Sequence, residues 1–338
     1  MSEIRLDKLH NQYVIIAPER LHRPNLREKS YKIKMHASCA FCNGHENLTP
    51  PEVFAIRDNG ANAPYWKTRV IPNLFKAVQI ELDNISKRDG MFESMAGLGA
   101  HEILIDTPCH DCDMDDLSNE SIENWLRSLI IRIDDLSKDT RLVHMSIFKN
   151  SGQNAGATQN HPHTQILALP VMPSNEMDFL QRNFKYYQEH GRGLVQDIVY
   201  NEQRDNERII HTYGSFVAYC PFASAFPFEV IISPTENIVS LHKCKRKEVS
   251  DLALIIKKVF DMLRVQLGKF DYNLSFHLPP INNNFENEPY MASLDKNFIF
   301  NIRITPRIYT LAGFEISTSM AINSVEPEEC AKLLRGDA

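Results

Sequence analysis

The sequence predicts an α+β protein in which one structural unit, made of mostly antiparallel strands with helices packed on them, occurs twice. The same order of strand, helix, strand, irregular loop and strand can be followed in both halves of the 338-residue chain. In each half the first strand contains a glutamate before an aliphatic run and is stopped by a proline, and the last strand also ends at a proline. Elements repeated in one order indicate an internal duplication. A chance resemblance between two generic strand-helix-strand runs is the alternative.

The first half contains its four elements between residues 100 and 170. Residues 100–106 (AHEILID) form a short apolar run before Thr-Pro, which is typical of a buried strand. Residues 121–137 carry apolar side chains at helical spacing. Residues 141–152 are predicted to be extended, and residues 161–170 (HPHTQILALP) form the last strand.

The second half repeats this order with residues 227–233 (PFEVIIS), 247–266, 270–280 and 297–306 (NFIFNIRITP). When the halves are aligned at their final prolines, three polar residues of the first half fall opposite residues that do not titrate. The aligned pairs are His161 with Asn297, His163 with Ile299, and Gln165 with Asn301. Only the first half therefore carries titratable chemistry at this strand.

The length predicts two domains, because a chain of this size usually exceeds what one hydrophobic core organises. We expect a catalytic domain at residues 1–173, a connector at residues 174–206, and a second domain without the catalytic histidines at residues 207–338. The connector is polar and contains Gly-Arg-Gly, so a connector helix and a lid are both compatible with it.

The composition is typical of a folded, soluble protein, with 43% apolar and 24% charged residues. A net charge of −6 and a pI near 6.1 argue against a nucleic-acid-binding surface, which needs clustered Lys and Arg. The first ten residues lack the apolar core of a signal peptide, and no run approaches the ~20 apolar residues of a membrane span. We therefore expect a cytoplasmic protein that binds neither nucleic acid nor membranes. Seven cysteines, an odd number, fit a reducing compartment where paired thiols bind metals rather than form disulfides.

The hexapeptide NHPHTQ at residues 160–165 concentrates the candidate chemistry. Side chains alternate along an extended chain, so His161, His163 and Gln165 project to one side. Histidine suits nucleophilic attack on phosphorus because neutral imidazole is abundant near pH 7 and its phosphoramidate is labile. A His-x-His pair also occurs as half of a metal site or as a surface accident.

Two neighbouring features can serve the same chemistry. The amide of Gln165 can donate a hydrogen bond to a non-bridging phosphate oxygen. The segment at residues 152–156 contains glycines, whose backbone amides can approach and cradle a phosphate. The order of glycine loop, His-x-His-x-Gln and strand is more informative than any of these features alone.

Cys39 and Cys42 form a Cys-x-x-Cys turn, the usual first half of a tetrahedral zinc site. A buried or redox-active pair is the alternative. The second half of the site is ambiguous from spacing, because residues 109–112 (CHDC) form another Cys-x-x-Cys with a histidine inside it. A four-cysteine site leaves His110 and His161 free, whereas a two-cysteine, two-histidine site uses both.

With these motifs the chain resembles the galactose-1-phosphate uridylyltransferase family of the histidine-triad (HIT) superfamily, and looks most similar to its ADP-glucose phosphorylase-like branch. The segments that carry the resemblance span nearly the whole chain. They are residues 17–24 (APERLHRP), 39–44 (CAFCNG), 106–110 (DTPCH), 148–165 (FKNSGQNAGATQNHPHTQ) and 312–335, which begins AGFEIST.

The resemblance implies two HIT-like units, a homodimer and a role for each matching residue. His163 is implied as the nucleophile. The implied ligands of one structural zinc ion per chain are Cys39, Cys42, His110 and His161. The implied contacts to substrate are Arg20 and Arg23 to the nucleotide, Gln165, Asn150, Gly156 and Thr158 to its phosphate and ribose, and Glu315 to the sugar.

Three departures from the family pattern concern the substrate. Thr164 stands where glycine or serine is usual, and we expect it to crowd the leaving group. The histidines of a second metal site found in some relatives are absent, with Asn297 at one of the positions. The glutamine that partners the sugar-binding glutamate in galactose enzymes is not evident near Met320, so the sugar remains open.

We therefore expect a nucleotidyltransferase that acts on a nucleoside diphosphate sugar through nucleotidyl-His163, with exchange of UDP-glucose and a hexose 1-phosphate as the leading reaction. The alternative acceptor is inorganic phosphate, in a phosphorylase of ADP-glucose or a dinucleoside polyphosphate. A nucleotide-binding protein without turnover and a hydrolase with a water-bound zinc are the remaining hypotheses.

Overall fold

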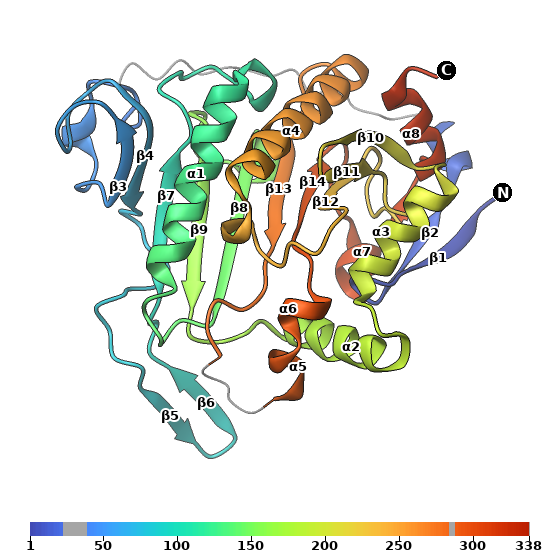
Figure 1. Cartoon of the computed structure of the whole chain (residues 1–338), viewed down its shortest axis with the longest axis horizontal. Helices are drawn as coiled ribbons and strands as arrows, with labels where there is room; N and C mark the ends of the chain where they lie inside the picture. The colour runs from blue at the N-terminus through green and yellow to red at the C-terminus, as the bar shows by residue number, and fades with distance from the viewer. Residues whose placement is uncertain (23–38, 284–287, 338) are drawn as a thin grey trace.

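A computed structural model describes residues 1–22, 39–283 and 288–337, and its central element is one antiparallel sheet of ten strands (Figure 1). The strand order is β10-β11-β12-β14-β13-β8-β9-β7-β4-β3. The bounds are β3 Phe54–Arg57, β4 Trp66–Pro72, β7 Ala100–Ile105, β8 His144–Ser151, β9 His163–Leu169, β10 Ile209–Tyr213, β11 Phe216–Tyr219, β12 Val230–Pro234, β13 Tyr272–His277 and β14 Asn301–Pro306.

The strand order displays the duplication. In the first half β9 lies between β7 and β8, and in the second half β14 lies between β12 and β13 in the same way. The two copies meet where β8 pairs with β13, antiparallel, with Asn150 opposite Asn273. The predicted α+β fold with a repeated, mostly antiparallel unit is thus confirmed, and the repeats share one sheet.

The described residues contain eight α-helices, which cover both faces of the sheet. Their bounds are α1 Asn119–Leu136, α2 Ser174–His190, α3 Leu194–Asp205, α4 Arg246–Leu267, α5 Pro289–Ala292, α6 Leu294–Asn297, α7 Gly313–Thr318 and α8 Pro327–Arg335. None of these helices is long and apolar enough to cross a membrane.

Helices α1, α4 and α8 pack on one face, where Trp125, Leu129, Ile256 and Phe260 are fully buried in the larger core. The apolar residues of α1 and α4 recur at helical spacing, so each helix presents one apolar stripe to the sheet. Helices α2 and α3 lie within the predicted connector and pack with α5 and α6 on the opposite face, around a second core that includes Phe298.

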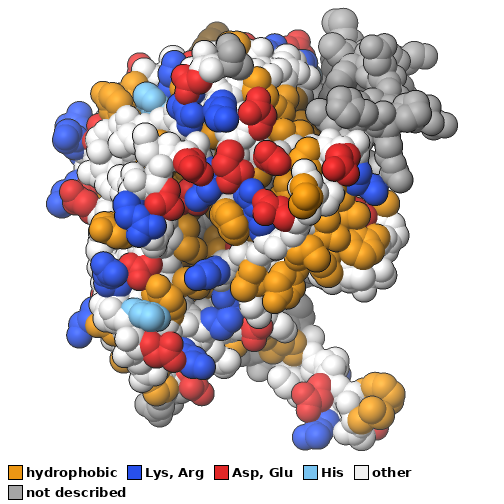
Figure 2. Space-filling model, turned by 90° about the vertical axis from the view of Figure 1, so that its right-hand side faces the viewer, with side chains coloured by type: hydrophobic (Ala, Val, Ile, Leu, Met, Phe, Trp, Pro, Cys, Tyr) orange, Lys and Arg blue, Asp and Glu red, His pale blue; other side chains and the backbone are white. Residues whose placement is uncertain are grey.

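Three further strands and one hairpin lie outside the main sheet. Strands β1 (Glu3–Asp7), β2 (Gln12–Ile16) and β15 (Ala321–Asn323) form a small sheet near both chain ends. On the side that carries the chain ends, cationic and anionic side chains are interspersed (Figure 2). Strands β5 (Ser86–Asp89) and β6 (Phe92–Met95) pair only with each other and project from the body (Figure 1).

One predicted strand is shorter than expected. Residues 297–306 were predicted to be extended, but β14 begins only at Asn301, and Asn297 is the last residue of α6. The amide of Asn297 donates to Ser293 Oγ at 2.8 Å, and its backbone carbonyl accepts from Asn183 at 3.2 Å. The local contact with Ser293 and the contact with Asn183 of the distant helix α2 together override the local strand pattern.

Candidate active site

Strand β9 places His163 on the face of the sheet opposite α1. Thr164 Oγ1 accepts a hydrogen bond from Trp125 Nε1 of α1 at 2.9 Å, so the Thr164 side chain faces that helix. Alternation along the strand then turns His163 and Gln165 to the other face. The expectation that Thr164 crowds the leaving group is therefore wrong, because its side chain lies on the far side of the strand from His163.

The His163 imidazole is buried and held in one orientation. Its Nδ1–H donates to the backbone carbonyl of His161 at 2.9 Å, which leaves the Nε2 lone pair available. The ring also packs edge-on against Phe41, with ring centroids 5.7 Å apart. Burial lowers the pKa of His163, the bond to the His161 carbonyl opposes this, and the nearby Lys149 ammonium lowers it further. The neutral form that attack on phosphorus requires is thus favoured.

Gln165 is oriented by a histidine that the sequence analysis did not identify. The Ala77 backbone N–H donates to His101 Nδ1 at 3.1 Å, so His101 Nε2 carries the hydrogen. This Nε2–H donates to Gln165 Oε1 at 3.1 Å. The Gln165 amide nitrogen is then the end that remains to donate to a ligand.

The glycine-containing loop follows β8 and packs against the second repeat. Gly152 has a φ of 83°, and a Cβ there would lie 1.8 Å from an Asp271 carboxylate oxygen, so only glycine fits. The Asp271 carboxylate accepts the Asn154 backbone N–H at 2.7 Å. Asn150 Oδ1 accepts a hydrogen bond from Asn273 at 2.8 Å. Gly156 and Thr158 are exposed in this loop.

Four potential metal ligands converge beside β9. The thiols of Cys39 and Cys42 and the imidazoles of His110 and His161 offer atoms that all lie within 4.8 Å of one another. Cys42 Sγ lies 3.3 Å from His110 Nδ1, and the two histidine Nδ1 atoms are 3.3 Å apart. Cys39 Sγ lies 3.7 Å from His161 Nδ1. The far nitrogen of His161 donates to the Thr107 carbonyl at 2.8 Å, which fixes its ring.

The donor set suits a cation. Burial raises the pKa of the Cys42 thiol to about 11, and burial lowers the pKa of His161 to about 4. Both groups are therefore neutral near pH 7 in the protein alone, and a bound divalent cation stabilises the thiolate form of a coordinating cysteine.

The two remaining candidate ligands are paired with each other. Cys109 and Cys112 form a disulfide with their Cα atoms 5.7 Å apart. The expectation that the cysteines serve metals rather than disulfides is wrong for this pair, because the turn around His110 brings both thiols together. A four-cysteine site is excluded for the same reason, and the two-cysteine, two-histidine arrangement is the one that the fold assembles.

Among the described residues, the side chains of Arg20 and Glu315 form no hydrogen bond or ion pair with His163 or Gln165. Arg20 is exposed in a short 3-10 helix (Pro18–His22), and Arg23 lies outside the described residues. Glu315 lies in α7, where its carboxylate accepts the Ala312 backbone N–H at 2.9 Å. Strand β14, which precedes α7, is separated from β9 by β13 and β8.

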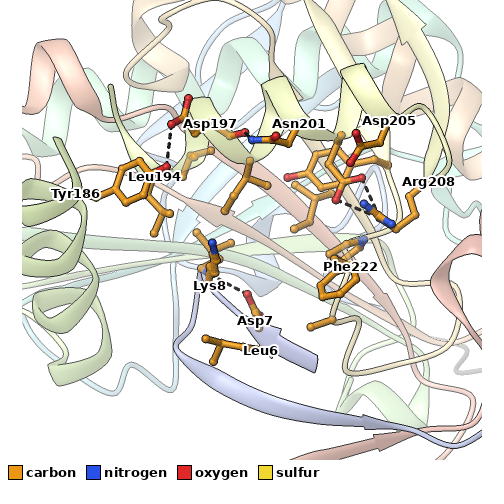
Figure 3. A pocket seen from close by; sticks show the side chains of 18 residues that line it. Leu6, Asp7, Lys8, Tyr186, Leu194, Asp197, Asn201, Asp205, Arg208 and Phe222 are labelled. Atoms are coloured by element: carbon orange, nitrogen blue, oxygen red, sulfur yellow. Dashed lines mark hydrogen bonds and ion pairs between the residues drawn. The ribbon is translucent and has the colours of Figure 1, made fainter. Parts of the chain in front are cut away.

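A separate cavity of 480 Å³ lies under α3, between α3, the first turn of the chain and β11 (Figure 3). Its acidic side chains are already paired. Asp197 accepts from Tyr186 at 2.8 Å, and Glu202 forms an ion pair with Arg208 at 2.9 Å. The lining contains none of the predicted site residues, so this cavity is distinct from the His163 site.

Comparison with known proteins places the chain in a family. The model of the galactose-1-phosphate uridyl transferase N-terminal domain matches residues 1–173, and that of the C-terminal domain matches residues 180–335. The chain is 30% identical to ADP-glucose phosphorylase from Arabidopsis thaliana, over 98% of this chain and 92% of that protein. It is 26% identical to galactose-1-phosphate uridylyltransferase from Thermotoga maritima, over 99% and 98% of the two chains.

The structures agree with this similarity. The crystal structure of the Arabidopsis thaliana ADP-glucose phosphorylase with bound ADP-glucose superposes with a TM-score of 0.83 at 29% identity, covering 99% of this chain and 98% of that one. With matches to both domains over nearly its full length, the chain belongs to the galactose-1-phosphate uridylyltransferase family.

Proposed function

We propose that the protein is a nucleotidyltransferase that acts on a nucleoside diphosphate sugar through a covalent nucleotidyl-His163 intermediate. The observation that carries this proposal is the His163 ring, whose Nδ1–H is bound to the His161 carbonyl while Nε2 keeps its lone pair. Nε2 attacks the α-phosphorus, an N–P bond forms, and the bond from phosphorus to the sugar 1-phosphate oxygen breaks. A phosphate oxygen of the acceptor then attacks the same phosphorus and releases His163.

The other polar residues of the site support the two phosphorus transfers. Gln165, oriented by His101, donates its amide N–H to a non-bridging oxygen of the transferred phosphoryl group. The loop with Asn150, Gly156 and Thr158 lies beside the same strand end and holds the phosphate and ribose. Arg20 and Arg23 are assigned to the nucleotide on family resemblance.

The covalent step predicts an adduct that depends on one residue. Mixing the protein with UDP-glucose or ADP-glucose is expected to add one nucleoside monophosphate to the intact mass. His163→Gly removes the nucleophile and should lower nucleotide exchange by about 10⁴-fold or more. His211→Asn, in β10, is the matched control and should keep the parental rate. Exchange by a folded His163→Gly variant at the parental rate, or a parental protein that binds nucleotide without forming an adduct, contradicts the proposal.

The acceptor distinguishes two members of this reaction class. We assign a hexose 1-phosphate, as in a uridylyltransferase that exchanges UDP-glucose. A phosphorylase of ADP-glucose or a dinucleoside polyphosphate is the second candidate, favoured by the 30% identity to the Arabidopsis thaliana ADP-glucose phosphorylase.

Parallel incubations with labelled hexose 1-phosphate and labelled inorganic phosphate separate these acceptors. A labelled nucleotide sugar formed from UDP-glucose is the expected product. If a labelled nucleoside diphosphate forms with inorganic phosphate and no labelled nucleotide sugar forms with the hexose 1-phosphate, the protein is a phosphorylase and not a uridylyltransferase. His163→Gly serves as the blank in both incubations, because both reactions need the nucleotidyl intermediate.

Zinc is proposed as the ion held by Cys39, Cys42, His110 and His161. Ligands placed tetrahedrally at ordinary zinc bond lengths stand about 3.3 Å apart for two nitrogens and about 3.6 Å apart for nitrogen and sulfur. The side chains here stand 3.3 Å and 3.3–3.7 Å apart. Four protein ligands close the coordination sphere, so the ion is structural and His163 is left to the chemistry.

The zinc assignment is tested by ligand substitution. His110→Ala should reduce zinc from one ion per chain to a substoichiometric amount, measured by elemental analysis, and should lower the melting temperature. The Cys109→Ser, Cys112→Ser double variant should keep its zinc. If the double variant loses its zinc, the four-cysteine site is supported and the proposed ligand set is wrong. If chelation abolishes activity at once, before any unfolding, the zinc-dependent hydrolase is supported instead.

A homodimer is proposed from the surface around Glu315. Ile308, Leu311, Phe314 and Ile316 are between 41% and 72% exposed in the segment that contains this glutamate. Apolar side chains gathered on a surface mark contact sites. Within one chain, β13 and β8 lie between β14 and β9. We propose that the dimer brings Glu315 of one copy to the sugar bound by the other.

A single substitution tests the dimer. Ile316→Asp should convert a dimer to a monomer in light scattering, because a charge at the interface is desolvated without a partner. Val265→Asp is the matched control, since Val265 is 87% exposed on α4 and should not affect the mass. A parental protein that is monomeric at micromolar concentration overturns the proposal.

A further inference from the structure

A network of buried polar side chains lies beneath the strand that carries His163. Trp125 Nε1–H donates to Thr164 Oγ1 at 2.9 Å, and the Thr164 hydroxyl donates to Asp106 Oδ1 at 2.8 Å. The Lys149 ammonium donates to the other carboxylate oxygen of Asp106 at 2.6 Å. Trp125, Thr164 and Asp106 are fully buried and Lys149 is 3% exposed. These four residues come from α1, β9, β8 and the position directly after β7, and we call them the Asp106 network.

Asp106 connects this network to three consecutive residues of the site. Its backbone N–H donates to the Pro162 carbonyl at 3.1 Å. Its carboxylate accepts from Thr164, and its partner Lys149 also reaches the His163 carbonyl at 3.4 Å. The residues before, at and after the nucleophile are thus all tied to Asp106 or to its ion-pair partner.

Stability alone does not account for this arrangement. Removing two charges from water is costly, and a well-packed apolar pair of similar volume is often as stable as a buried ion pair. The ion pair adds directional hydrogen bonds, because both Asp106 oxygens and the Lys149 ammonium have defined partners. Strand β9 therefore cannot shift without breaking these hydrogen bonds. The buried pair therefore sets the position of the strand.

We propose that Asp106, acting through Thr164 and Lys149, is a positioning residue for His163. This inference rests on the nucleophilic role proposed for His163. The bond from Nδ1 to the His161 carbonyl fixes the rotation of the ring, and the Asp106 network fixes the backbone from which the ring projects. Both are needed to aim Nε2, because a displacement of about 1 Å can cost about 10²-fold in rate. The Thr164 hydroxyl thus has a function, because it joins the strand to Asp106.

The proposal is tested on the first half-reaction with matched variants. Thr164→Val keeps the volume and removes the hydroxyl, and Thr164→Ser keeps the hydroxyl. Thr68→Val is the control, because Thr68 Oγ1 makes a comparable buried hydrogen bond, 2.7 Å, to Ser128 of α1 from strand β4. For each protein the measurements are the rate of nucleotidyl-His163 formation by rapid quench, the Kd of UDP-glucose or ADP-glucose, and the melting temperature.

Thr164→Val is expected to slow adduct formation by about 10- to 100-fold with the Kd changed less than about threefold. Thr164→Ser should restore the rate to within about threefold, and Thr68→Val should lower the melting temperature similarly at the parental rate. If Thr164→Val and Thr68→Val lose stability alike and both keep the parental rate, Thr164 is merely structural and the inference is wrong.

A second variant covers the case in which Thr164→Val does not fold. Asp106→Asn keeps the shape but replaces one acceptor oxygen with an amide that cannot accept from Lys149 or Thr164. It is expected to slow adduct formation by at least about 10-fold at little-changed Kd, and a parental rate overturns the inference. A parental protein that forms no adduct refutes the proposed function instead, so the two failures are distinguishable.

Discussion

The hydrogen bond between His163 Nδ1 and the carbonyl of His161 is the contact on which the rest of the site depends. One residue, His161, contributes its side chain to the four-ligand cluster and its backbone oxygen to the neighbouring imidazole. Its ring is fixed on its far side by the Thr107 carbonyl. The orientation of the His163 ring is therefore tied to whatever holds the four-ligand cluster together.

Phe41 adds a second link of the same kind. It lies between the two cysteines of the Cys-x-x-Cys turn and packs against both His161 and His163, with ring centroids 6.1 and 5.7 Å away. A change at the turn is thus transmitted to the His163 ring by direct contact. On the opposite face of β9, Asp106 and Lys149 hold the backbone, so the strand is constrained from both sides.

Local pattern was enough to predict the elements and part of the site. The alternation of a strand places His163 and Gln165 on one face, and the spacing of Cys39 and Cys42 predicts half of a metal site. Spacing alone left His110, Cys109 and Cys112 open as further ligands, because it does not say which side of a turn meets another turn. The family resemblance selected His110, and the structure places it with Cys39, Cys42 and His161. His101, Asp106 and Lys149 were missed since their roles come from the register of β7 and β8 against β9. Asn297 was misassigned because a contact with α2, more than 100 residues away in sequence, decides its conformation.

The pairing of β8 with β13 gives a structural role to the second repeat, whose final strand, β14, contains no histidine. Strand β8 bears Lys149 and leads into the glycine-containing loop at residues 152–156. Without β13, the outer edge of β8 would expose unpaired backbone amides and carbonyls that can bind other chains. The second repeat thus covers the strand edge that the first repeat presents at β8. Cutting the chain between the repeats would expose the paired edges of β8 and β13, so neither repeat is expected to fold as an independent, monomeric protein.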